Sequence, residues 1–400
     1  MSDSNSSVKP LPPGSMLGVM GGGQLGRMFA HAAQSMGYST CVLDPDATSP
    51  AGLVSHKHIK TSYTDAQGLA EMAASCAAVT TEFENVPAQA LDVLARSVPV
   101  APGARAVSVA QDRMAEKRFF AECARQSGVG PAPYACIESA ADLAAVTDDL
   151  LPGILKTARM GYDGKGQARV RTREELAKAW EQLKQVPCVL EKMLPLQSEC
   201  SLIIARNAQG QVVSLPVQVN IHRDGILAVT EVFDGAAPAA LVPKAREAAK
   251  TIAEGLGYVG VLCIEFFIVQ GANGSELVVN EIAPRPHNSG HYSIDACDVS
   301  QFELQVRAMA NLPLVTPRLH SASVMLNLLG DLWFAQGDAA IEPAWDQILA
   351  LPGAHLHLYG KTEARRARKM GHLTITATNI DEARRVALQA AQILGIAPWL

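Results

Sequence analysis

The chain has 400 residues, 48% of them hydrophobic and 18% charged, and a formal net charge of −5. This composition is that of a soluble globular protein with two or three domains, and the acidic balance excludes a nucleic-acid-binding protein that relies on a broad basic surface. The eight cysteines are scattered without C-x-x-C spacing, which argues against a disulfide framework or a structural zinc site. Because no apolar run approaches the roughly 20 residues that span a bilayer, we expect a cytoplasmic protein with neither a membrane nor a nucleic-acid partner.

The N-terminal third has the pattern of a parallel α/β domain. The polar, proline-rich start MSDSNSSVKPLPPG predicts a disordered lead-in over residues 1–15 and not a signal peptide. Over 16–107, short apolar strands alternate with alanine-rich helices. The glycines of MGGGQLGRM precede a helix predicted over 25–36, and Asp44 ends the next strand. A dinucleotide-binding dehydrogenase is one interpretation; a smaller phosphorylated ligand beside Gln24, or simple tight strand–helix packing, are the others.

The middle block, 108–312, has a helix predicted over 111–126 and then several strands. Lys156 ends a strand, and the glycine-punctuated basic loop TARMGYDGKGQ follows it. Glycines give such a loop freedom to close over a ligand, and lysines suit phosphates; a solvated hairpin turn is the alternative. Glu191 closes the strand CVLEKM, and Glu199 follows. Strand-end backbone groups and carboxylates can bind adenine and ribose, although a solvated strand end explains the same residues.

Two glutamates lie opposite each other in a predicted β-hairpin. The apolar runs VLCIEFFIVQ and ELVVNE flank the turn GANG. If that turn centres on Asn273, Glu265 and Glu281 are direct cross-strand partners. Opposed like charges destabilise a sheet by roughly 0.2–1 kcal/mol, and a hard divalent cation removes that cost. The alternative is a β-bulge that places the two side chains on opposite faces of the sheet.

Two polar loops follow the hairpin. NEIAPRPHNSGH gathers Arg285, His287 and Asn288 directly after the second glutamate, and a loop so rich in hydrogen-bond donors is typical of a site. Its two histidines are expected to form hydrogen bonds and not to bind zinc. In the last block, 313–400, the basic run YGKTEARRARKMGH joins two strands. It suits a loop that meets an anion, a solvated charged face being the alternative.

Together, the glycine turn, the Lys156 loop, the Glu191 strand end and the paired glutamates resemble the ATP-grasp superfamily. More narrowly, GGGQLGRM, GYDGKGQ, NEIAPRPHNSGH, SQFELQVRA and YGK with RKMGH are similar to the N5-carboxyaminoimidazole ribonucleotide synthetases. The resemblance implies an ATP-grasp fold of mixed α/β and α+β class. A Rossmann-like domain would precede an ATP-grasp domain with a lid subdomain over about 130–195, and a small β-rich C-terminal domain would follow.

The resemblance also implies a reaction and a homodimer. ATP and bicarbonate would give carboxyphosphate, which carboxylates the exocyclic amine of aminoimidazole ribonucleotide. A formate-dependent glycinamide ribonucleotide transformylase is the nearest enzymatic alternative. A non-catalytic nucleotide-binding regulator is another, although the set of phosphate and metal groups gives it no support.

The resemblance implies a role for individual residues. Magnesium would be held by Glu265 and Glu281. The implied ATP contacts are Arg113, Lys156, Glu191, Glu199 and Asn280. The implied ribonucleotide contacts are Gly23, Gln24, Leu25, Glu82, His287, Asn288, Lys361 and Arg368. The implied catalytic residues are Tyr162, Asp163, Lys165 and Arg285, with Asp163 a candidate for proton management of the amine. One position departs from the pattern, because Ala367 stands where a glycine is expected before Arg368.

Overall fold

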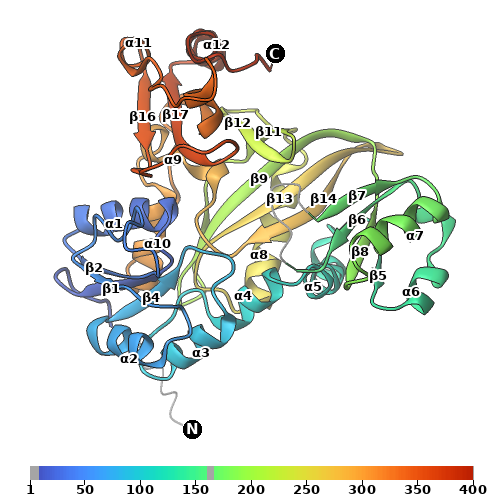
Figure 1. Ribbon diagram of the computed structural model, residues 1–400, viewed down its shortest axis with the longest axis horizontal. Coiled ribbons are helices and arrows are strands. Elements are labelled where there is room, and N and C mark those ends of the chain that lie inside the picture. The colour runs from blue at the N-terminus through green and yellow to red at the C-terminus, as the bar shows by residue number, and fades with distance from the viewer. Residues whose placement is uncertain (1–8, 160–165, 400) are drawn as a thin grey trace.

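The structure is a computed structural model that describes residues 9–159 and 166–399. In this part of the chain the strands form three sheets, of four, nine and four strands. Figure 1 shows the N-terminal sheet at lower left, the long antiparallel sheet in the centre, the smaller sheet at right and the C-terminal elements at the top. Among the described residues, no helix has both the length and the apolar character needed to cross a membrane.

The N-terminal sheet is parallel, as predicted, with the strand order β3-β2-β1-β4. Its strands are β1 (Met16–Met20), β2 (Ser39–Leu43), β3 (Lys57–Ile59) and β4 (Ala78–Thr81). The helices of this region are α1 (Gln24–Ser35), α2 (Ala66–Ser75), α3 (Ala88–Ala95) and α4 (Ala104–Ala110). The helix predicted over 25–36 is therefore confirmed, one residue earlier. Because the strands are parallel, the loop from β1 to α1 lies at the carboxyl edge of the sheet, where α/β folds bind ligands.

A small antiparallel sheet with the order β5-β8-β6-β7 follows α5. Asp112 begins α5 by accepting from the N–H groups of Met114 and Ala115, and Gly128 (φ 71°) ends it in the left-handed conformation. The elements of this region are α5 (Arg113–Ser127), β5 (Tyr134–Ile137), α6 (Ala140–Ala145), η1 (Asp148–Leu150), β6 (Gly153–Thr157), β7 (Gln167–Val170), α7 (Arg173–Gln182) and β8 (Cys188–Lys192). Trp180 of α7 and Leu190 of β8 belong to its own buried cluster, so this sheet has a separate core.

The central sheet has the order β14-β13-β9-β11-β12-β15-β17-β16, with β10 paired to β9. Its strands up to the predicted hairpin are β9 (Leu196–Arg206), β10 (Val212–Ser214), β11 (Gln218–Arg223), β12 (Ile226–Val232), β13 (Gly260–Gly271) and β14 (Gly274–Ala283). Leu262, Ile264 and Phe266 of β13 face α8 (Val242–Gly255) in one core, whereas Val261 and Cys263 share another core with α10 (Gln301–Met309). Because side chains alternate along a strand, the next odd-numbered residue, Glu265, lies on the α10 face.

The C-terminal strands extend this same sheet, because β12 pairs with β15. The remaining elements are η2 (Asn288–Gly290), α9 (Ser293–Ala296), β15 (Ala322–Leu329), η3 (Gly330–Phe334), α11 (Trp345–Leu349), β16 (Ala354–Leu358), β17 (Lys369–Ala377) and α12 (Ile380–Leu394). Helix α12 packs on the apolar face of β15 and β17, and the other face is directed toward α9 and α1 (Figure 1). The boundary predicted at 312/313 thus falls between α10 and β15, while the hydrogen-bonded sheet runs across it. The boundaries of the domains remain predictions.

Candidate active site

The two glutamates of the hairpin are direct cross-strand partners, as predicted. The turn itself differs from the expectation, because Gly271 pairs with Gly274 and two residues, not a centre at Asn273, join the strands. An unbroken ladder from that turn would place Glu265 opposite Asn280. A register shift between Glu265 and Phe266 instead places it opposite Glu281. One extra residue on one strand shifts every later pairing. We considered a bulge as the feature that would separate the two glutamates, whereas here the bulge places them opposite each other.

The paired carboxylates lie in a buried, negatively charged setting. Glu265 is 8% exposed, and burial, followed by the charges of Glu281 and Glu199, raises its pKa well above the ordinary value. Burial, with Glu281 adding to it, also raises the pKa of Glu116 to about 8, although the neighbouring lysine lowers it. Several carboxylate oxygens that repel one another out of water are a donor set for a hard divalent cation. The Oδ1 atom of Asn280 is buried nearby on the same strand without a hydrogen-bond partner in the described residues.

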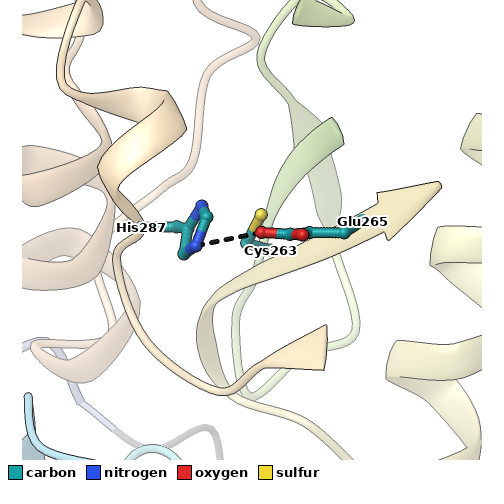
Figure 2. A group of neighbouring side chains, drawn as sticks. All are labelled: Cys263, Glu265 and His287. Atoms are coloured by element: carbon teal, nitrogen blue, oxygen red, sulfur yellow. Dashed lines mark ion pairs between the residues drawn. The ribbon is translucent and has the colours of Figure 1, made fainter. Parts of the chain in front are cut away.

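His287 lies directly against Glu265, as Figure 2 shows, with Nε2 at 3.1 Å from Oε1. The other ring nitrogen, Nδ1, is 2.9 Å from the Oγ atom of Ser289, and the backbone N–H donates to Gln301 Oε1 at 2.8 Å. Burial, with the charge of Arg285, lowers the pKa of His287 well below its ordinary value. Because Nδ1 also accepts from the backbone N–H of Ser289 at 3.3 Å, Nε2 is the nitrogen that donates toward Glu265. Contact of His287 with a ribonucleotide remains a prediction.

Glu191 is enclosed by two lysines. Its Oε2 atom is 3.1 Å from Lys117 Nζ and its Oε1 atom is 3.0 Å from Lys156 Nζ. Burial opposes ionisation, but Lys117 and then Lys156 outweigh it and lower the pKa of Glu191. Lys117 also donates to the carbonyl oxygen of Asn280 at 2.6 Å. The lysine expected to bind phosphate is thus held by Glu191. Both carboxylate oxygens of Glu191 face lysines, and its backbone lies between Tyr134 of β5 and Ile154 of β6 in the sheet, so contact of Glu191 with adenine remains a prediction.

Sequence reasoning missed Lys117 and Glu116, which connect α5 to the hairpin of β13 and β14. Glu116 Oε1 accepts from the N–H of Ile282 at 2.9 Å, directly after Glu281 in the chain. Glu116 ends the first turn of α5 and Lys117 follows it, and charged residues on a helix are normally solvated. Asp112 could be recognised in the sequence as the N-cap of this helix, which places Glu116 and Lys117 near its start. That position does not show that the two side chains are buried.

Glu199 is paired with a residue that the sequence did not single out. Its Oε2 atom is 2.8 Å from Nδ1 of His222 on the neighbouring strand. A register shift between Ile221 and His222 turns this part of β11, and Glu199 itself is opposite Asn220. The pair lies on the sheet beside Glu265, whose pKa the charge of Glu199 helps to raise. Ribose binding by Glu199 remains a prediction.

The glycine turn at the start of α1 is closed by the protein's own carboxylates. The N–H of Gly22 donates to Asp44 Oδ2 at 2.7 Å, and those of Gly23 and Gly26 donate to the Glu82 oxygens at 2.8 and 3.3 Å. A Cβ atom on Gly22 would meet a serine hydroxyl at 2.4 Å. A pyrophosphate needs these same N–H groups, so the geometry opposes the dehydrogenase interpretation. Burial raises the pKa of Glu82 despite these hydrogen bonds.

The basic C-terminal loop reaches the start of α1. A Cβ atom on Gly360 would lie 3.0 Å from Nη1 of Arg27. Lys361 donates to the carbonyl of Lys369 at 2.5 Å, and burial, with the charge of Arg368, lowers its pKa to about 8. Arg368 Nη1 donates to a loop carbonyl at 2.8 Å. Because Glu82 also acts on the pKa of Lys361, the structure brings together the predicted ribonucleotide contacts of the two ends of the chain.

Two further predicted residues lie between these groups. Arg285 pairs with Glu84 through Nη2, and burial lowers its pKa to about 10. Asn288 is 8% exposed, and both polar atoms of its amide lack a partner in the described residues. A buried amide with no partner costs about 1–3 kcal/mol, which a bound ligand would offset.

The remaining predictions concern two loops. Gln24 and Leu25 open α1, beside the glycine turn. Arg113 opens α5, and its Nη1 donates to Thr157 O at 3.3 Å, at the base of the glycine-rich loop. That loop is largely outside the described residues, and with it the predicted catalytic residues Tyr162, Asp163 and Lys165.

Comparisons with known proteins agree with this geometry. The ribonucleotide synthetase preATP-grasp domain family matches residues 15–111, the ATP-grasp domain family residues 122–302, and the phosphoribosylaminoimidazole carboxylase C-terminal domain family residues 323–386. The N5-carboxyaminoimidazole ribonucleotide synthase of Brucella melitensis is 44% identical over 371 residues, which cover 91% of this chain and 97% of that protein.

Solved structures agree over similar lengths. An ADP complex of an N5-carboxyaminoimidazole ribonucleotide synthetase superposes with a TM-score of 0.87 at 38% identity, covering 97% of this chain and 99% of that one. The Aspergillus clavatus enzyme in complex with ADP and 5-aminoimidazole ribonucleotide has a TM-score of 0.84 at 30% identity, covering 96% and 100%. The chain therefore belongs to the N5-carboxyaminoimidazole ribonucleotide synthase family of ATP-grasp proteins.

Proposed function

We propose that the protein carboxylates 5-aminoimidazole ribonucleotide with bicarbonate, using ATP, in de novo purine biosynthesis. The observation that carries the proposal is the cross-strand pair of Glu265, which is buried, and Glu281, together with the link from this pair to Glu191. Lys117 contacts both Glu191 and the carbonyl oxygen of Asn280, directly before Glu281, and this arrangement suits a metal-bound nucleotide. Relatives bearing the synthase name, and one with ADP and the aminoimidazole ribonucleotide bound, support the choice of substrate.

Glu265 and Glu281 fit magnesium, because oxygen ligands are those it prefers and their mutual repulsion calls for a cation. When bound, the metal would neutralise charge on the ATP phosphates. Lys156 and Arg113 would contact those phosphates, and Glu199 would accept from the ribose hydroxyls. Positioning and charge neutralisation supply most of the rate in phosphoryl transfer. The ion pair with Glu191 keeps the ammonium group of Lys156 in place before ATP binds.

The ribonucleotide would bind between the α1 turn and the basic C-terminal loop. Lys361 and Arg368 would attract its phosphate, and the unpartnered amide of Asn288 would donate and accept. Arg285 and His287 are held by Glu84 and Glu265 beside that space. Glu82 would act mainly by holding the glycine turn in shape.

The reaction has two balanced steps. A bicarbonate oxygen attacks the γ-phosphorus of ATP, ADP leaves, and carboxyphosphate forms. The exocyclic amine then attacks the carboxyphosphate carbon, the carbon–oxygen bond to phosphate breaks, and the amine gives up one proton. Asp163 is the sequence-predicted acceptor of that proton. Water must be kept from the mixed anhydride until the amine attacks.

The test is ADP release with ATP, magnesium and bicarbonate, with and without aminoimidazole ribonucleotide. We expect strong stimulation by the ribonucleotide that disappears when formate replaces bicarbonate. Stimulation by glycinamide ribonucleotide with formate would favour the transformylase instead. ADP release that no phosphoribosyl amine stimulates would refute the proposed substrate.

A homodimer and a cytoplasmic location also belong to this proposal. Both are supported by membership of a family of biosynthetic enzymes. Light scattering on the purified chain measures the mass directly, and about 42 kDa, the mass of one chain, would rule the dimer out.

A further inference from the structure

A cluster of histidines lies outside the site described above, where the C-terminal strands meet α9. His357 of β16 and His372 of β17 are cross-strand partners, and their rings stack with centroids 4.5 Å apart. Asp295 of α9 places Oδ2 at 2.9 Å from Nε2 of His357. One ligand atom from each of the three residues lies within 4.8 Å of the others. None of the three has a part in the proposed reaction.

His372 has a nitrogen that the protein leaves unused. The residue is fully buried, its Nδ1 atom is 3.1 Å from the hydroxyl of Tyr359, and its Nε2 atom has no partner in the described residues. Burial lowers the pKa of His372 well below its ordinary value, so the ring is neutral. A neutral imidazole with one nitrogen hydrogen-bonded and the other carrying a free lone pair is the form that binds metals.

The surrounding face of the sheet is also short of hydrogen-bond partners. Asn327 is the cross-strand partner of His372 on β15, and its Oδ1 atom is buried without a partner in the described part of the chain. The same holds for Oγ1 of Thr374, two residues along β17. Buried polar atoms are normally satisfied. Their accumulation around one histidine points to a bound group, either a cation with its water ligands or water alone.

We propose that Asp295, His357 and His372 form a binding site for a borderline divalent cation such as Zn²⁺. Two imidazoles and one carboxylate are a common ligand set for zinc with an open fourth position, and nitrogen donors disfavour magnesium and calcium. His355, whose Nδ1 atom is 3.7 Å from Asp295 Oδ1, or water would take the fourth position.

A cation can reach the three side chains from solvent, and one of the two stacked rings must turn to bind it. The side chains of His357 and His355 are 28% and 40% exposed, so a cation can enter from their side. A shared metal must lie in the plane of each ring, and the stacked rings are nearly parallel, at 11°. Binding therefore turns His357, the more exposed ring, out of the stack. The occupied site would tie α9, which follows the loop with His287, to the C-terminal strands.

The experiment uses the full chain, stripped of metal with a chelator and titrated with Zn²⁺ by calorimetry and with Co²⁺ by visible absorption. His357→Ala and Asp295→Asn test the site, and the second variant keeps the shape of the side chain. His56→Ala, which removes an exposed histidine that contacts Thr40 of the N-terminal sheet, is the matched control. We expect one bound cation in the parent chain and in the control, and at least tenfold weaker binding in both test variants.

A second group with metal-binding spacing needs its own control. Cys263, Glu265 and His287 also bring ligand atoms together (Figure 2), so Cys263→Ser is included. We expect that variant to bind like the parent, and the Co²⁺ spectrum to lack the near-ultraviolet band of sulfur ligation. Loss of binding in Cys263→Ser would overturn the proposal, and so would unchanged binding in both test variants. No binding of Zn²⁺ or Co²⁺ to the parent chain would also overturn it and would leave water as the occupant. None of these readouts depends on turnover.

Discussion

Replacing Lys117 by methionine tests how much the buried ion pair between Lys117 and Glu191 contributes to the free energy of unfolding. The side chain of Lys117 is 2% exposed and that of Glu191 is 5% exposed, so the ion pair is out of water. Methionine keeps the length of the side chain and removes the charge. Glu191 would keep only Lys156, at 3.0 Å, and the carbonyl of Asn280 would lose its donor.

The expected cost follows from what is left unpaired. Removing one partner of a buried ion pair costs about 3–5 kcal/mol. The second lysine compensates part of the charge on Glu191, so we expect about 3 kcal/mol, to which the unsatisfied carbonyl contributes. The matched control is Lys57→Met on the surface, where a pair at 2.9 Å has side chains 34% and 48% exposed. There we expect about 1 kcal/mol or less.

Urea unfolding of the parent and both variants at neutral pH measures these differences, with circular dichroism as the signal. Equal losses of stability in Lys117→Met and Lys57→Met would refute the reasoning, because burial would then add nothing to the pair. A double-mutant cycle with Glu191→Gln separates the pair itself from the lost packing.

The dependence of stability on pH gives a second test of the ion pairs that Glu191 forms with Lys117 and Lys156. In the folded chain the lysines lower the pKa of Glu191, so the stability that its ionisation contributes is present above the ordinary carboxyl pKa of about 4.3 and is lost as the pH falls through the folded value. Without Lys117 the folded pKa of Glu191 rises. The variant should therefore begin to lose stability at a higher pH than the parent.

Three further predictions concern the site. Glu281→Gln should abolish ADP formation and, without metal, leave the free energy of unfolding equal or higher by about 0.2–1 kcal/mol, because it relieves a like-charge pair; normal turnover would mean that the metal assignment is wrong. Because burial lowers the pKa of Lys361 to about 8, its charge is lost above that pH. The KM for the ribonucleotide should then rise, and Lys361→Arg should flatten the profile; parallel profiles would exclude a contact. Ala367 has φ 61°, so Ala367→Gly should stabilise the chain by up to about 1 kcal/mol, which thermal unfolding against Ala364→Gly as control would show.

Much of the fold follows from local patterns. The alternating strands and helices of the first block, the helix of α5 and the hairpin of β13 and β14 are set by periodicity and turn residues, which act over a few positions. The glutamate pair was predicted correctly, but not because of the turn: the turn residues alone would place Glu265 opposite Asn280, and a bulge that no turn residue signals sets the observed register.

The tertiary structure decided which charged residues are buried and what they contact. Lys117 and Asn280 are 163 positions apart, and Glu82 reaches the glycine turn across 59, so no local pattern distinguishes either from a solvated residue. The same holds for Asp295 and His357, which only the packing of α9 on the C-terminal strands brings together. The sequence by itself determined the elements and the chemical groups available, because those depend on short-range periodicity. Their partners, their burial and hence their pKa values depend on contacts between distant segments, which only the folded chain defines.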